Sequence, residues 1–142
     1  MTTREYLDEQ LVAQETATNR RRLSDLRTAY AGRGIRLSES AAVTMCIREA
    51  LPLLEKASTD LERLVVAHAV LPGAKRGEPL DKQLVIQETS ANRARLFQLC
   101  LRYNNGDRPE PRKGNDRLLE ASAVRLCIAV ALPRLLTEAG AS

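Results

Sequence analysis

The polar and apolar positions of the chain follow one pattern twice. Residues 7–30 match residues 80–103 at an offset of 73, with 14 identities in 24 positions. The match resumes between residues 37–54 and 118–135, with 10 identities in 18 at an offset of 81, so the second copy holds eight extra residues. This internal repeat indicates two structural units of the same type in one chain.

The later segment of each copy has the periodicity of an amphipathic helix. Its apolar residues recur at intervals of three and four, which places them on one helix face. The two stripes are Val43, Cys46, Ile47, Ala50, Leu51 and Leu54, and Val124, Cys127, Ile128, Ala131, Leu132 and Leu135. Ser38 suits the N-cap of the first helix. The second helix has fewer polar residues opposite its stripe, so we expect it to be buried more completely.

Shorter helices and a loop are predicted between the repeated blocks. The segments NRRRLSDLRTAYAG and NRARLFQLCLRYNNG predict helices that end at Gly32 and Gly106. The eight extra residues fall in YNNGDRPEPRKGNDR, which is rich in Gly, Pro, Asn and charge. This composition is typical of a surface loop.

The repeated string itself, LVAQETATNRRRL at 11–23 and LVIQETSANRARL at 84–96, allows two interpretations. With a period of two, Leu11 and Ala13 point to one side of a short strand and their neighbours to the other. Thr16 and Thr89 would then cap the helices that follow. With a heptad period, one long helix is formed instead, and the fold becomes an all-α tandem helical repeat. Its seam would consist of Val12, Thr16, Asn19, Leu23, Leu26 and Tyr30.

Size and composition favour one compact, mainly helical unit. A chain of 142 residues suits one domain or two very small ones that share a core. Only three Tyr and one Phe are present and Trp is absent, so Leu, Val, Ile and Ala must form the core. The net charge of +4 is a mild basic excess that is compatible with nucleic acid or another acidic partner.

Targeting signals and enzyme motifs are not found in the sequence. No apolar run reaches the roughly 18 residues of a membrane span, and the start MTTREYLDEQ lacks a signal peptide's apolar region. We therefore expect a cytoplasmic protein without a membrane partner. The three cysteines form no CxxC pair, and His68 is the single histidine, which argues against a disulfide framework and a metal site. We expect no enzyme activity, no catalytic residue, no cofactor and no small-molecule ligand.

The order of short strand, helix, glycine turn and Ser-capped helix resembles the ribbon-helix-helix family of bacterial, plasmid and phage DNA-binding proteins. The closest piece is GIRLSESAAVTMCIREAL at 34–51, and the resemblance covers about 45 residues of each copy. Glu15 and Glu88 depart from it, because the family usually places an apolar residue at this inward strand position. The family dimerises by pairing its strands, so a tandem chain could supply both halves.

The resemblance implies a mainly α fold with two fused ribbon-helix-helix repeats, joined through a short two-stranded antiparallel ribbon into one pseudo-two-fold unit. The first repeat would span 7–57 and the second 80–139. The connector, 58–79, would hold a short helix over 59–71 followed by a loop.

The same resemblance implies sequence-specific binding of double-stranded DNA through a ribbon in the major groove. Gln can pair with adenine and Val can contact a thymine methyl group, which suits base reading. The base-reading candidates are Gln10, Val12, Gln14, Gln83, Val85 and Gln87. The phosphate-binding candidates are Ser38, Ser40, Arg36, Lys113 and Arg117. The implied role is a transcriptional repressor or an accessory factor in plasmid transfer or maintenance, with a second copy on an adjacent DNA site as a further partner.

Alternatives remain open for several of these residues. The Gln side chains are also compatible with a solvated strand or helix face, and so are Arg20, Arg21 and Arg22. Glu15 and Glu88 are compatible with ion pairs to Arg20, Arg93 or Lys82. The alternative function, which follows from the long-helix interpretation, is an all-helical protein–protein interaction module.

Overall fold

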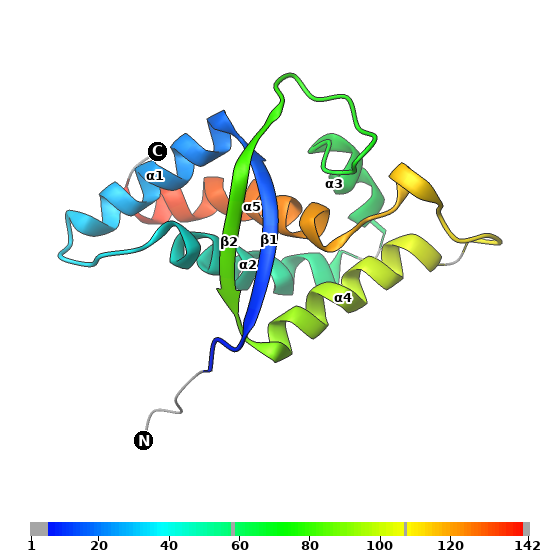
Figure 1. The fold of residues 1–142 in the computed structure, drawn as a ribbon, viewed down its shortest axis with the longest axis horizontal. Coiled ribbons are helices and arrows are strands. Elements are labelled where there is room, and N and C mark those ends of the chain that lie inside the picture. Colours follow the sequence, from blue (N-terminus) through cyan, green and yellow to red (C-terminus); the bar gives the residue numbers. More distant parts are fainter. Residues whose placement is uncertain (1–5, 58, 107, 141–142) are drawn as a thin grey trace.

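The computed structural model describes residues 6–57, 59–106 and 108–140. It is mainly α-helical with one two-stranded antiparallel sheet, and two long helices follow each strand (Figure 1). The elements are β1 (Glu9–Thr16), α1 (Ala17–Ala31), α2 (Glu39–Lys56), α3 (Leu61–Ala67), β2 (Leu80–Glu88), α4 (Ser90–Asn105), a 3₁₀ turn (Gly114–Asp116) and α5 (Glu120–Glu138). Within this part of the chain, none of the helices combines the length and the apolar character that crossing a membrane requires.

The strands predicted for the repeated string are confirmed, and the alternative of one long helix is wrong. Thr16 has an extended backbone, with φ −70° and ψ 155°, and its Oγ1 accepts a hydrogen bond from the Asn19 N–H at 3.2 Å. Thr89 caps α4 in the same way, with Asn92 as the donor. In each copy a threonine at or directly after the end of the strand therefore starts the following helix.

The strand register has the symmetry that the repeat predicts. Val12 pairs with Val85, and Gln10 and Gln14 pair with Gln87 and Gln83. In the repeat, Gln83 is the counterpart of Gln10 and Gln87 is the counterpart of Gln14. This pairing is the one that a pseudo-two-fold axis through the Val12–Val85 pair produces. The two copies form one pseudo-two-fold unit.

Each strand is supported by the second helix of the other copy. β1 contacts α5, and β2 contacts α2. The two helices pack against each other behind the ribbon, while α1 and α4 extend to opposite sides (Figure 1). As expected, α5 is buried more completely than α2, with buried residues around most of its circumference. The core is therefore shared, because neither copy covers its own strand.

The cysteines are core residues, as their spacing suggested. Cys46, Cys100 and Cys127 are all free and buried. Burial raises the pKa of the Cys46 thiol to about 12 and that of Cys100 to about 11. These thiols are therefore protonated near neutral pH and poorly reactive.

The longer inter-helix loop of the second copy is held by its own polar contacts. Asn104 exchanges two buried hydrogen bonds with the backbone of Leu118, at 3.0 and 2.7 Å. The Arg112 guanidinium lies 4.1 Å from the centroid of the Tyr103 ring and donates to the Tyr103 carbonyl at 3.1 Å. The described residues of this loop are thus fixed to the end of α4.

The connector packs against that same loop. It contains α3, whose Leu61 and Val65 are buried, and then runs to β2 as an irregular segment. The Gly73 N–H donates to the Asn115 carbonyl at 3.2 Å. The connector therefore lies on one side of the pseudo-two-fold unit and makes the two halves unequal.

Candidate nucleic-acid interface

The outer face of the ribbon carries an uncharged row of side chains. Two valines occupy its centre, with Val12 40% exposed and Val85 47% exposed. Glutamines flank them on both strands and are exposed as well. The complete outer row is Gln10, Val12, Gln14, Gln83, Val85 and Gln87. All six predicted base-reading residues therefore share one surface.

The inner face of the ribbon fixes this orientation. Leu11 and Ala13 on β1, and Leu84 and Ile86 on β2, are at most 2% exposed. A shift of one residue in either strand would expose these apolar side chains and bury the glutamines. The hydrophobic effect therefore keeps the Gln and Val side chains pointing outward.

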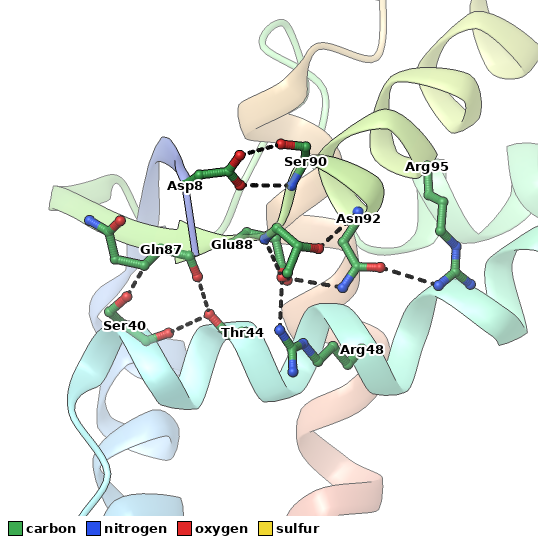
Figure 2. Close-up of polar contacts among 10 residues, drawn as sticks. Asp8, Ser40, Thr44, Arg48, Gln87, Glu88, Ser90, Asn92 and Arg95 are labelled. Atoms are coloured by element: carbon green, nitrogen blue, oxygen red, sulfur yellow. Dashed lines mark hydrogen bonds and ion pairs between the residues drawn. The ribbon is translucent and has the colours of Figure 1, made fainter. Parts of the chain in front are cut away.

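Two hydroxyl groups of α2 bind the edge of β2. The Gln87 N–H donates to Ser40 Oγ at 2.9 Å, and Thr44 Oγ1 donates to the Gln87 carbonyl at 2.7 Å (Figure 2). This places Ser40, a predicted phosphate-binding residue, beside the end of the ribbon. Its oxygen accepts from Gln87, while its hydroxyl hydrogen can still be donated to another group.

The edge of β1 is bound differently. The residues equivalent to Ser40 and Thr44 in the second copy are Ala121 and Arg125. Arg125 Nη1 donates to the Gln14 carbonyl at 3.3 Å, whereas Ala121 has no group that could reach the strand edge. The two ends of the ribbon thus differ in chemistry.

The phosphate-binding candidates lie on both sides of the ribbon. Ser38 caps α2, with its Oγ accepting from the Ala41 N–H at 3.0 Å, and Arg36 is exposed in the loop before it. Lys113 and Arg117 are exposed in the loop before α5, whose cap residue Leu119 makes no side-chain cap bond. In Figure 1 that loop lies at the far end of α4 from the ribbon. The structure thus groups Ser38 with Ser40 and separates them from Lys113 and Arg117.

Two arginines of the first helices form ion pairs within the fold. Arg20 pairs with Glu39 at 3.2 Å and with Asp81 at 3.4 Å. Its counterpart Arg93 pairs with Glu120 at 2.9 Å and with Glu9 at 2.8 Å. Each arginine connects its own helix to the strand of the other copy and to the start of the second long helix of its own copy. The alternative in which Glu15 and Glu88 pair with Arg20, Arg93 or Lys82 is not what the described residues form.

Glu88 forms a buried polar cluster instead. Its side chain is 0% exposed, and Oε1 accepts from Arg48 Nη2 at 3.1 Å and from Asn92 Nδ2 at 3.2 Å. The Thr89 N–H donates to the same oxygen at 2.8 Å. The inward glutamate thus joins the end of β2 to α2 and to the first turn of α4.

Glu15 occupies the equivalent position on β1 with fewer partners. It is 2% exposed, and its Oε1 accepts from the Thr16 N–H at 2.8 Å. Its Oε2 is buried without a hydrogen-bond partner among the described residues. Burial raises the pKa of Glu15, and the Thr16 N–H, the Asn19 side chain and the Arg125 charge offset only part of this effect. The ionised carboxylate is therefore destabilised in the folded state.

Glu15→Gln is expected to stabilise the protein at neutral pH. Because the folded-state pKa is raised, the protonated carboxyl contributes its full stability below the ordinary value of 4.5. That contribution is lost as the pH rises through the raised pKa, whereas Gln remains neutral. Urea unfolding of both proteins at several pH values should show a larger free energy of unfolding for the variant at pH 7 and no difference below pH 4.5. A variant that is less stable at pH 7 would contradict this.

The sequence pattern missed several residues that shape the site. Thr44, Arg48 and Arg125 lie in the two helices predicted only for their apolar stripes. Arg125 could have been identified from the sequence, because it interrupts an otherwise apolar stretch, SAVRLCIAV at 122–130. A charged side chain on a buried helix requires polar partners, and Arg125 finds them in the Gln14 and Val70 carbonyls and the Ser122 hydroxyl.

The chain has no match among protein-family models, curated proteins or solved structures. Within the described residues, no group of three or more His, Cys, Asp or Glu side chains could hold a metal ion. The interpretation of the interface therefore depends on the residues and contacts of this chain.

Proposed function

We propose that this protein binds double-stranded DNA sequence-specifically, with its ribbon in the major groove, as a tandem ribbon-helix-helix protein. The observation that carries the proposal is the outer face of the ribbon, where glutamines and valines point away from the core. The major groove admits a two-stranded ribbon, and Gln and Val can recognise adenine and the thymine methyl group there.

The pseudo-two-fold axis suggests the form of the DNA site. The axis passes through the Val12–Val85 pair, so the same glutamine pattern extends in both directions along the ribbon. Such a protein suits an inverted repeat, because the two halves of the site present equivalent base edges. The unequal loops and connector favour an imperfect repeat, in which the backbone contacts of the two sides differ.

Because the outer face of the ribbon is uncharged, residues that flank the ribbon must attract the DNA phosphates. Ser38 and Ser40 lie at the N-terminus of α2, where the helix dipole and the hydroxyl groups favour an anion. Lys113 and Arg117 supply positive charge on the second-copy side. Phosphate contacts of this kind position a protein on DNA, while base contacts select the sequence.

This chemistry suits a transcriptional repressor or an accessory factor of plasmid transfer or maintenance. A gel-shift experiment with DNA from upstream of the protein's own gene, against random DNA of equal length, tests the proposal. We expect binding to the upstream fragment to be at least about 10³-fold tighter. Equal affinity for the two fragments would contradict sequence-specific recognition. A second shifted species at higher protein concentration would indicate a second copy on an adjacent site.

The protein-interaction alternative loses its structural basis. It depended on one continuous helix with a heptad seam from Val12 to Tyr30. The residues up to Thr16 form β1 instead, and α1 begins only after them.

The double variant Lys113→Ala/Arg117→Ala is expected to weaken binding equally on cognate and random DNA. If both side chains contact phosphate, the slope of log K against log salt should decrease in magnitude by about 0.9 for each. Fluorescence anisotropy at several salt concentrations measures both quantities.

Arg63→Ala is the matched control for this experiment. Arg63 is an exposed arginine of α3, and its side chain pairs with Asp60 at 3.5 Å. The control should leave the salt slope unchanged. An unchanged slope in the double variant would exclude Lys113 and Arg117 as phosphate contacts.

A further inference from the structure

A pocket of about 530 Å³ lies where the connector passes the end of β1. Its walls come from β1, the first turn of α1, the connector and α5. The residues that matter for its chemistry are Glu15, Ala69, Arg76, Arg125 and Ala129. Since the connector lies on one side of the molecule, the pocket belongs to one half of the pseudo-two-fold unit.

Two arginines converge on one wall of this pocket. Arg125 Nη2 donates to the Val70 carbonyl at 2.9 Å, and Arg76 Nη2 donates to the Val70 and Leu71 carbonyls at 3.5 and 2.6 Å. Within the described residues, neither guanidinium forms an ion pair with a carboxylate. Two neighbouring positive charges thus share a neutral acceptor, which is an arrangement that an anion would stabilise.

Both sides of the pocket contain buried polar atoms without partners. Arg125 is only 6% exposed, and its Nε has no hydrogen-bond partner among the described residues. Glu15 lines the same pocket, and its Oε2 is unpartnered, as is Oε2 of its counterpart Glu88. Buried polar atoms in folded proteins are usually satisfied, so the unpartnered Nε of the buried Arg125 guanidinium, unlike the carboxylate oxygens, marks a difference of this half and a position for an acceptor.

The other half of the molecule differs at this position. There, Arg48 extends from α2 to Glu88 and binds it at 3.1 Å. The residue of α5 at the position equivalent to Arg48 is Ala129, which lines the pocket. Glu15 therefore lacks the arginine that its counterpart binds, and the connector supplies much of the pocket wall on this side.

The end of α3 forms part of the pocket wall. Ala69 has φ +51°, and among the described residues it is the only one other than glycine with a positive φ. It ends α3 as the left-handed residue of a C-terminal cap, in which the Ala69 N–H donates to the Val66 carbonyl at 3.1 Å and the Val70 N–H to the Val65 carbonyl at 3.5 Å. The Val70 carbonyl lies beyond this cap and accepts from the two arginines.

We propose that this pocket binds a small organic anion, with its carboxylate or phosphate group held by Arg76 and Arg125. Arg76 uses only Nη2 for its backbone bonds, which leaves its remaining N–H groups for the ligand. Glu15 Oε2 accepts a hydrogen bond from a hydroxyl or ammonium group elsewhere on the ligand. Lys75, which also lines the pocket, adds to the positive charge at its rim.

Occupancy of the pocket is coupled to the ribbon. Arg125 donates to the Gln14 carbonyl at 3.3 Å, and Glu15 follows Gln14 directly in β1. A ligand that draws the Arg125 guanidinium into the pocket changes the support of this strand end. The ligand is therefore an effector of DNA binding, and this second step, unlike the binding itself, rests on the proposed function.

Thermal unfolding without DNA tests the binding step. The probes are inorganic phosphate, succinate and O-phosphoserine at up to 10 mM, each compared with chloride at equal ionic strength. A probe that binds the native state well above its Kd should raise the Tm of the wild-type protein by about 3 to 8 °C. A response to the two phosphate compounds identifies a phosphate ligand, and a response to succinate identifies a carboxylate.

Ala129→Arg is the matched variant, because the chain itself places an arginine at the equivalent position 48. It should fill the pocket, pair with Glu15 and abolish the response to every probe. Arg76→Gln, at a partly exposed residue, should also abolish it and provides a second test if Ala129→Arg does not fold. No shift with any of the three probes, or an equal shift in a folded variant, would overturn the proposal.

The coupling is measured separately with the cognate DNA fragment. A probe that raises the Tm should change the DNA affinity of the wild-type protein at least threefold and leave that of Ala129→Arg unchanged. An unchanged wild-type affinity would exclude the effector role. If the protein binds no specific DNA, the proposed function fails, while the thermal shifts still decide whether the pocket binds an anion.

Discussion

The double variant Gln83→Ala/Gln87→Ala is expected to lose between about 30-fold and 10⁴-fold of its affinity for cognate DNA. Each glutamine that pairs with a base contributes roughly 1–3 kcal/mol, so the two together contribute roughly 2–6 kcal/mol. Both side chains lie on the exposed face of β2, away from the core, so the fold should be retained. The loss should therefore appear in DNA binding and not in the free energy of unfolding.

The salt dependence separates this effect from a loss of phosphate contacts. Neutral side chains release no counterions, so the slope of log K against log salt should stay the same in the double variant. Affinity for random DNA should also stay the same, because base contacts contribute little to it. Gln98→Ala, which removes an exposed glutamine of α4, is the control. Retention of the cognate preference in the double variant would exclude the ribbon as the base-reading surface.

Glu88→Gln is expected to lower the free energy of unfolding by about 2–3 kcal/mol at pH 7. The substitution removes the negative charge that Arg48 binds and leaves a buried amide in a site arranged for a carboxylate. About a third of the Arg48 side chain is exposed, so water solvates part of the released charge and limits the loss. Urea unfolding measures the difference.

Glu15→Gln is the matched control, because the same substitution is made at the equivalent residue of the other strand. Its expected effect has the opposite sign at pH 7, since Glu15 lacks a direct partner among the described arginines. Equal destabilisation by both substitutions would mean that the two glutamates have the same role. A stable Glu88→Gln variant would mean that its ion pair with Arg48 contributes little.

Local chemistry was sufficient to predict the elements and the outward face. Alternation places Leu11 and Ala13 inside and Val12 outside, and Thr16 and Thr89 start their helices as N-caps. These features depend on residues within four positions of one another. The repeat then supplied the pairing, because a strand with one apolar face needs a partner of the same kind.

The roles of the inward glutamates could not be predicted, because their local sequences are nearly identical. Both glutamates follow a Gln and precede a Thr. Glu88 nevertheless forms an ion pair with an arginine, and Glu15 does not. The difference is decided by Arg48 and its counterpart Ala129, which lie 40 and 114 positions away from Glu88 and Glu15 in the sequence. Such a distinction appears only when the helices are packed against the strands.

The sequence pattern likewise did not predict the pocket. Ala129 appears in the sequence as an ordinary small residue of an apolar helix, and its significance depends on the glutamate that packs near it. The connector was predicted as a simple link between repeats. In the structure it also forms a wall, which its composition does not indicate.

The crosswise support of the strands affects how the chain is made. Paired residues of the ribbon lie 64 to 79 positions apart, so β1 leaves the ribosome long before its partner strand exists. Until then the apolar side of β1 and the stripe of α2 lack the surfaces that cover them in the native fold, and such exposed segments promote aggregation. Pairing between distant segments also slows folding relative to a simple helical bundle. Translation must therefore pass residue 88 before the nascent chain can complete its ribbon, and must reach α5 before the apolar side of β1 is covered.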